Sequence, residues 1–191
     1  MSRRRVRLRT PRFGRTGYAG GFVLFLLLVV VTIVAGLPYF AAGDDGQRPP
    51  LEAQATTLTL PAGQTLASLE QGAVAKVVDG DTIDVELNGK TVRVRYFGVD
   101  TPERGDRCYR EATDRNETLI GETVLLLKDQ RVQDAFGREL RYVFLPDGTS
   151  VDATLVAEGF GVAWTQDGRY REQIVALETQ ARTDDRGCLW K

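Results

Sequence analysis

Acidic side chains occur in two short clusters that together could hold a divalent cation. The first cluster is the tetrapeptide DGDT at residues 79–82, and the second is DTPE at residues 100–103. Two carboxylates held close together repel each other unless a cation neutralises them. Carboxylates combined with backbone carbonyls suit Ca²⁺ or Mg²⁺, which prefer oxygen ligands. Asp81 and Asp100 are therefore candidate metal ligands, provided that the fold brings them together.

A guanidinium group and a further carboxylate accompany these candidates. Arg95 lies five residues before Asp100, and Glu103 lies three residues after it. A cation and a guanidinium can stabilise the charge on a phosphoryl group under attack, and a free carboxylate can take a proton from water. The set suits hydrolysis of a phosphodiester. Asp-Gly and Asp-Thr-Pro are also common turn sequences, however, and each tetrapeptide alone favours that simpler interpretation.

A β-hairpin is expected to bring the two clusters together. Apolar residues alternate along residues 83–87 and 92–96, on either side of Asn88-Gly89. Both turn residues tolerate the positive φ of a type I′ turn, so this dipeptide is a strong hairpin signal. A hairpin folded here places the start of one strand beside the end of the next. Asp81 and Asp100, 19 positions apart, then become neighbours at one end of a sheet.

The rest of the pattern predicts a small barrel with helices. Strands are expected at 73–78, 83–87, 91–97, 124–132 and 140–145. Helices are expected at 110–120 and 151–158, the latter between a Ser150 N-cap and Gly159, and a third across 170–181, where apolar residues recur at helical spacing. The predicted fold is α+β but mainly β: a five-stranded OB barrel with about three helices.

The N-terminal part is typical of a membrane segment. Seven arginines occupy residues 1–16, and no acidic residue precedes Asp44. Residues 17–43 carry no charge; a span needs about 20 apolar residues, whereas the core of a signal peptide usually has about 7–15. The arginines predict a cytoplasmic N-terminus. We expect an uncleaved single-pass anchor; a signal cleaved near Ala41-Ala42-Gly43 is the alternative, and a buried core helix is the least favoured interpretation.

Four segments follow from this pattern. They are a basic cytoplasmic segment at 1–16, an anchor or signal at 17–43, a linker at 44–71 that contains Pro49-Pro50 and at most a short strand at 56–60, and a folded domain at 72–191. The domain would face outside the cell, or be secreted after cleavage. Without the seven N-terminal arginines, 18 basic residues face 26 acidic ones, a net charge of −8. This charge does not favour tight binding of a polyanion.

Two residue types limit the chemistry further. The sequence has no histidine, which excludes His-ligated zinc, a Ser-His-Asp triad and a histidine base. The two cysteines, Cys108 and Cys188, form an even pair in a chain expected to be exported, which favours a disulfide between them. Two free buried thiols are the alternative.

A third patch, DAFGRELRY at residues 134–142, lies between the last two expected strands. Gly137 suits a tight turn from which Arg138 would project. Together with DGDT, with Arg95 before DTPE, and with the ending GCLW at 187–190, this patch resembles the staphylococcal nuclease (thermonuclease) family. The resemblance covers about residues 73–190. Each motif alone is weak, but four of them occur in the family's order and spacing.

The resemblance implies a five-stranded OB barrel with three helices that hydrolyses DNA and RNA with Ca²⁺, leaving 3′-phosphate ends. It implies that the metal ligands are the carboxylates of Asp81 and Asp100 and the backbone carbonyl of Thr101, with Asp79 near the metal. It also implies that Glu103 is the general base, and that two arginines grip the scissile phosphate. Those arginines are Arg95 and Arg138.

The sequence departs from the family pattern around the nucleotide. Ala135 and Phe136 replace a Lys-Tyr pair before the Gly-Arg turn, Trp164 and Gln166 stand in place of two pocket tyrosines, and the basic loop after DTPE is shortened. Phe136 and Trp164 can still stack on bases, although an aromatic residue in a small barrel is more often part of the core.

These observations predict a Ca²⁺-dependent, membrane-anchored nuclease that acts on DNA, RNA or both, as a monomer with no protein partner. The alternative from another class is an inactive OB module that binds single-stranded nucleic acid or another envelope ligand. Retention of both arginines and Glu103 favours the enzyme. A glycosidase with two carboxylates would leave Arg95 and Arg138 without a role.

Overall fold

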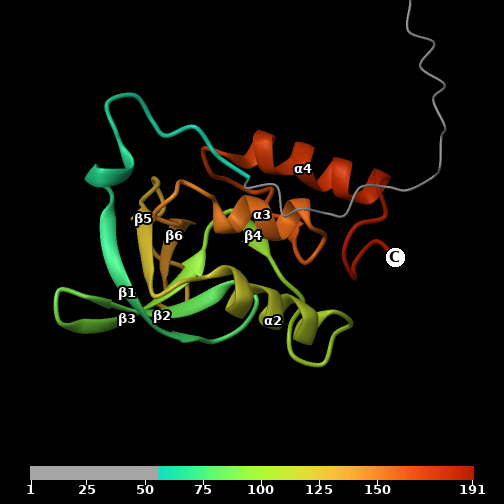
Figure 1. Ribbon diagram of the computed structural model, residues 1–191, viewed down its shortest axis with the longest axis horizontal. Coiled ribbons are helices and arrows are strands. Elements are labelled where there is room, and N and C mark those ends of the chain that lie inside the picture. The colour runs from blue at the N-terminus through green and yellow to red at the C-terminus, as the bar shows by residue number, and fades with distance from the viewer. Residues whose placement is uncertain (1–55) are drawn as a thin grey trace, which may run out of the picture. The chain divides into compact units, whose positions relative to one another are not determined.

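Five strands close into a barrel in this computed structural model, which describes residues 56–191 (Figure 1). The spatial order is β1-β2-β3-β6-β5, and β1 pairs with β5 to complete the barrel. All pairs are antiparallel except β3 with β6. This closed five-stranded barrel fits the predicted OB architecture. The strands are β1 (Glu70–Val77), β2 (Thr82–Leu87), β3 (Lys90–Tyr96), β5 (Thr123–Leu127) and β6 (Glu139–Phe144).

The predicted hairpin joins β2 to β3. Asn88 and Gly89 have φ values of 51° and 77°, so both turn residues occupy the left-handed region. Leu87 pairs with Lys90, which leaves a two-residue loop. The alternation of β2 places its apolar side chains inside the barrel, where Ile83 and Val85 are fully buried. Sequence periodicity and turn chemistry therefore agree here.

Three α-helices and one 3₁₀ turn surround the barrel. They are η1 (Leu66–Ser68), α2 (Tyr109–Leu119), α3 (Val151–Ala157) and α4 (Arg171–Thr183). The Ser150 hydroxyl accepts a hydrogen bond from the Ala153 amide (3.3 Å), as expected of an N-cap. Gly159, just past α3, has a φ of 75°. All residues of α3 are buried, and α3 lies against α4 beside the barrel (Figure 1).

Two details differ from the predicted strands. The strand expected to run to Val132 ends at Leu127, because the residues that follow make tertiary contacts instead: the Asp129 carboxylate accepts a hydrogen bond from the Arg169 amide (2.7 Å). A small two-stranded sheet of β4 (Val99–Asp100) and β7 (Val162–Ala163) was not predicted. Strands of two residues are too short for any periodicity to show.

Residues 56–71, assigned from the sequence to a linker, contact the barrel. Leu58 is part of the hydrophobic core, and β1 already begins at Glu70. The Thr59 carbonyl accepts a hydrogen bond from the Tyr170 hydroxyl (2.9 Å), and Thr57 forms an isolated β-bridge with Thr149. The possible strand at 56–60 is therefore reduced to this one bridge. The folded domain includes these residues as well as 72–191.

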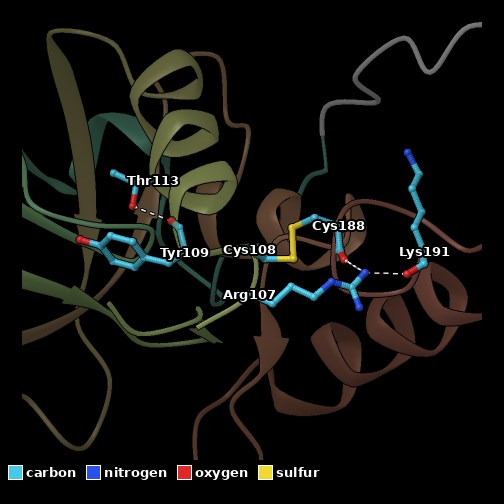
Figure 2. The surroundings of a disulfide bond; sticks show 6 residues. All are labelled: Arg107, Cys108, Tyr109, Thr113, Cys188 and Lys191. Atoms are coloured by element: carbon cyan, nitrogen blue, oxygen red, sulfur yellow. Dashed lines mark hydrogen bonds between the residues drawn. A yellow bond between two sulfur atoms is a disulfide. The ribbon is translucent and has the colours of Figure 1, made fainter. Parts of the chain in front are cut away.

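A disulfide joins Cys108 to Cys188, as the two cysteines predicted (Figure 2). The two Cα atoms are 5.7 Å apart, across a sequence separation of 80 residues. Next to it, the Arg107 guanidinium donates hydrogen bonds to the backbone carbonyls of Cys188 (2.6 Å) and Lys191 (2.5 Å). The loop that follows the second acidic cluster is thus tied to the C-terminal segment.

The expected anchor or signal at 17–43, the basic segment before it and the first part of the linker lie outside the described residues. No helix among residues 56–191 combines the length and apolarity that a membrane span requires.

Candidate active site

Arg95 on β3 connects the two acidic clusters. Its Nε lies 3.0 Å from Asp81 Oδ1, and its Nη2 lies 2.5 Å from Asp100 Oδ1. Its Nη1 donates to the backbone carbonyls of Tyr96 (2.7 Å) and Val99 (2.5 Å). The fold therefore brings Asp81 and Asp100 together as the hairpin predicted. The contact between them runs through Arg95, a residue that is only 8% exposed.

Asp81 is a buried carboxylate held in place by Thr101. Asp81 Oδ2 accepts hydrogen bonds from the Thr101 amide (2.7 Å) and hydroxyl (2.9 Å). Burial raises the Asp81 pKa to about 6, although Arg95 and the Thr101 amide favour the ionised form. Asp79 supports the turn from the other side, since its Oδ1 accepts from the Asp81 amide (3.2 Å). Part of the role of the DGDT motif is therefore to stabilise a turn.

The donor atoms of this centre are all oxygens, which fits a hard cation and not zinc. The carboxylates of Asp81 and Asp100 both contact the Arg95 guanidinium, Asp81 at Nε and Asp100 at Nη2. Within residues 56–191, no group of three or more His, Cys, Asp or Glu side chains is arranged to hold a metal ion. A cation here would therefore have two carboxylates, with the Thr101 carbonyl and water completing its shell.

A cleft of about 630 Å³ opens beside this centre. It brings the three predicted catalytic residues together with the two predicted stacking residues. The Asp100 side chain is 49% exposed at the cleft, and Glu103 is exposed. The lining residues come from β3, from β4 and the acidic loop after it, from the segment between β5 and β6, and from the segment after β7: Arg95, Asp100, Glu103, Arg131, Asp134, Ala135, Phe136, Arg138, Trp164, Gln166 and Asp167.

Arg138 is presented by a turn before β6. Gly137 has a φ of 79°, which confirms the predicted tight turn. The Asp134 carboxylate accepts hydrogen bonds from the Arg138 Nε (2.6 Å) and from the amides of Phe136 and Arg138 (2.9 Å each). Among the described residues, no hydrogen bond engages the Nη1 or Nη2 atoms of Arg138. These two donors remain available to an anionic oxygen in the cleft.

The two predicted stacking residues differ in burial. Phe136 is 85% exposed, so it is not a core residue, and the Arg138 guanidinium carbon lies 5.7 Å from its ring centre. Trp164 is partly buried and packs against the core while still lining the cleft. Its indole Nε1 donates a hydrogen bond to Asp167 (2.7 Å). Both side chains can therefore meet a ligand in the cleft.

Sequence reasoning missed Arg131 and Asp167. Their side chains form a bidentate ion pair on the cleft wall, with Nε–Oδ2 and Nη2–Oδ1 distances of 2.8 and 2.9 Å. They are 36 positions apart in the sequence. No local sequence pattern identifies either residue as part of a site. Arg131 lies in the segment predicted to be a strand, and Asp167 precedes a glycine in what the sequence suggests is an ordinary turn.

Comparison with known proteins identifies the family of this chain. Residues 93–191 match the model of the family described as staphylococcal nuclease homologue. This chain belongs to the staphylococcal nuclease family. The match covers just over half of the chain. It includes Arg95, the second acidic cluster, the Gly-Arg turn and both cysteines.

Several relatives of this staphylococcal nuclease homologue carry nuclease names. An uncharacterized endonuclease of Escherichia coli O157:H7 is 37% identical over 121 residues, which cover 62% of this chain and 76% of that protein. The thermonuclease of Staphylococcus hyicus is 34% identical over 130 residues, 63% and 76% of the two chains. A micrococcal nuclease of Shigella flexneri is 33% identical over 129 residues, 63% and 73% of the two chains.

Proposed function

We propose that this protein is a metal-dependent nuclease that hydrolyses phosphodiester bonds of DNA, RNA or both in the cleft beside Arg95. The observation that carries the proposal is the cleft itself, in which Glu103, Arg95 and Arg138 meet two aromatic side chains. A carboxylate and guanidinium groups can act in the hydrolysis of a phosphodiester, and aromatic groups can stack on the bases beside it. The nuclease names of the relatives support the same activity.

The two arginines act on the phosphate in different ways. Arg138 has both Nη atoms available, so it can donate two parallel hydrogen bonds to phosphate oxygens, which a lysine cannot. Arg95 also lines the cleft, and Asp81, Asp100 and two carbonyls hold its guanidinium in a fixed position there. Preorganised charge of this kind stabilises negative charge that grows in the transition state.

Glu103 is the proposed general base. It is exposed on the loop between β4 and α2 and lines the cleft. A carboxylate in this position can take the proton from the attacking water and leave the arginines to hold the phosphate.

Calcium is the proposed cofactor, held by the carboxylates of Asp81 and Asp100 and the carbonyl of Thr101, with Asp79 supporting the turn. When bound, it would add positive charge beside the scissile phosphate and polarise its oxygens. With two carboxylates, we expect modest affinity, and Mg²⁺ should support less turnover because it demands stricter octahedral geometry.

Digestion of single- and double-stranded DNA and of RNA by the full-length protein tests this proposal. We expect cleavage with Ca²⁺, loss of cleavage in excess chelator and recovery when Ca²⁺ is restored. Products should carry 3′-phosphate ends, as the family resemblance implies. Full activity in chelator would reject the metal assignment. Binding of single-stranded nucleic acid without any cleavage would favour the alternative, an inactive OB module.

We also propose that the protein is exported and anchored by residues 17–43, with the barrel outside the cell and no protein partner. The support is the uncharged length of this segment and the seven arginines before it.

A further inference from the structure

The wall of the cleft that carries Trp164 is built differently from the wall that carries Phe136. Phe136 is exposed, and the Asp134 carboxylate accepts hydrogen bonds from the amides of Phe136 and Arg138 and from the Arg138 side chain. Trp164 is fixed through its own side chain, because Asp167 Oδ1 accepts its indole N–H at 2.7 Å.

Arg131 completes this fixation. The Asp167 carboxylate that accepts from Trp164 also accepts two hydrogen bonds from the Arg131 guanidinium. The Arg131 guanidinium carbon lies 5.5 Å from the Trp164 ring centre and 5.0 Å from that of Phe97. Phe97 is 3% exposed and packs on Tyr142 in the core. The guanidinium therefore connects the indole to a rigid part of the barrel.

The backbone also enforces the position of Asp167. The next residue, Gly168, has a φ of 108°, and a Cβ atom there would lie 2.4 Å from the Tyr142 hydroxyl and 2.7 Å from the Phe97 ring. Only glycine fits such a close approach. The backbone at Gly168 therefore packs against Phe97, which also contacts Arg131, and against Tyr142.

We propose that Arg131 and Asp167 are positioning residues that hold the Trp164 indole as a fixed surface on which a base of the substrate stacks. This inference rests on the proposed nuclease function. A stacking surface that is ordered before binding loses less side-chain entropy when the base arrives. The pair therefore acts on recognition of the base, whereas Glu103, Arg95 and Arg138 act on the phosphate.

If the pair only stabilised the fold, its loss would lower the free energy of unfolding and would not change base recognition. Each side chain is partly exposed, 36% for Arg131 and 41% for Asp167, and ion pairs this exposed contribute little to the free energy of unfolding. Loss of the pair should therefore leave the fold intact and change only the behaviour of Trp164. Base stacking contributes enough to binding that its loss should be measurable as a rise in KM.

The experiment compares an oligonucleotide that has all its bases with the same oligonucleotide carrying abasic sites around the scissile phosphate. For Asp167→Ala and Arg131→Ala, we expect KM for the normal substrate to rise about tenfold, with kcat nearly unchanged. Wild-type KM should already be higher on the abasic substrate, and the variants should not raise it further. The near-isosteric Asp167→Asn, which keeps an oxygen acceptor but loses the charge, should give an intermediate KM.

A matched control comes from the β2–β3 hairpin. Asp84 and Arg93 form an equivalent bidentate pair, with Nε–Oδ1 and Nη2–Oδ2 distances of 2.8 and 3.0 Å, outside the lining of the cleft. Asp84→Ala should leave both KM values unchanged. In a Trp164→Ala background, Asp167→Ala should cause no further change in KM, because the residue that it positions is already absent.

Two results would overturn the inference. One is an unchanged KM for the normal substrate in folded Asp167→Ala and Arg131→Ala variants. The other is an equal rise in KM on the normal and the abasic substrate, which would separate the pair from base recognition. Failure of the wild-type protein to cleave either substrate would instead reject the proposed function, so the two failures are distinguishable.

Discussion

Among single residues, Arg95 and Arg138 differ in how much of each guanidinium is hydrogen-bonded to the protein, and this difference indicates different roles. Arg95 uses all three nitrogens on protein acceptors and is nearly buried, so it is a structural residue as well as a charge in the cleft. In Arg138, hydrogen bonds from the side chain to the described residues use only Nε. Substitution of the two should therefore have different effects on stability.

Arg138→Lys and Glu103→Gln should each lower kcat by at least about 10²-fold, the scale of losing one group that acts in the transition state. Neither residue is buried, so the free energy of unfolding should change by less than about 1 kcal/mol. Steady-state kinetics together with urea unfolding would test both statements. A wild-type kcat in folded Arg138→Lys or Glu103→Gln would remove that residue from the mechanism.

Arg95→Lys should lower kcat by a similar factor and also destabilise the fold. A lysine cannot reach Asp81, Asp100 and two backbone carbonyls at once, so buried acceptors lose their partner at a cost of about 1–3 kcal/mol. Thermal unfolding of this variant beside Arg138→Lys would show the contrast. Equal melting temperatures would contradict the structural duty of Arg95.

Buried Asp152 should make stability depend on pH. Its carboxylate accepts from the amides of Gly98 (2.7 Å) and Val143 (2.9 Å), yet burial raises its pKa from 3.8 to about 6. Because the folded state binds this proton more tightly, the contribution is fully present below pH 3.8 and is lost as pH rises through 6. The size is up to about 3 kcal/mol. In urea unfolding, the free energy of unfolding should fall between pH 4 and 7. Asp152→Asn should make this pH dependence weaker. The share of the pH dependence that comes from Asp81, whose pKa is also raised, would remain.

At the scale of elements, the acidic loop between β4 and α2 is fixed at both ends. β4 pairs with β7 at its start, and the disulfide ties Cys108, just before α2, to the C-terminal segment (Figure 2). Glu103 stands between these two fixed points. The disulfide therefore restrains the loop that carries the proposed base, although it lies outside the lining of the cleft.

Loss of the disulfide should reduce stability more than chemistry. A cross-link across 80 residues is worth roughly 4–5 kcal/mol in the chain-entropy model. The Cys108→Ser/Cys188→Ser double variant should lose up to that amount in urea unfolding, while kcat per folded molecule stays close to wild type. Peptide mass spectrometry without reductant should find the two cysteine peptides joined. Free thiols at both positions would contradict the bond.

At the scale of the whole molecule, the expected topology places the barrel on the outer side of the membrane. The seven N-terminal arginines precede the uncharged segment, and short positively charged flanks remain in the cytoplasm. Protease added to intact cells should therefore release a barrel fragment that immunoblotting can detect. A control cytosolic protein should stay intact. Fractionation of the full-length chain with the cytosol would reject this topology.

Four features could be predicted from the sequence: the barrel, the hairpin, the disulfide and the approach of Asp81 to Asp100. These features depend on period-two alternation, on the positive φ of Asn88-Gly89 and on an even cysteine count, all of which are local or compositional properties. The resemblance to the family could also be recognised from the sequence, because it depends on the order and spacing of short motifs.

The assembly of the cleft, in contrast, depends on contacts between distant segments. Arg95 lies between the two carboxylates because buried acceptors from separate segments converge on one guanidinium, and no spacing rule encodes that convergence. The pairing of Arg131 with Asp167 likewise depends on a segment that leaves the strand pattern early and meets the turn after β7. Long-range packing chooses such partners, because many polar residues could satisfy the same local pattern.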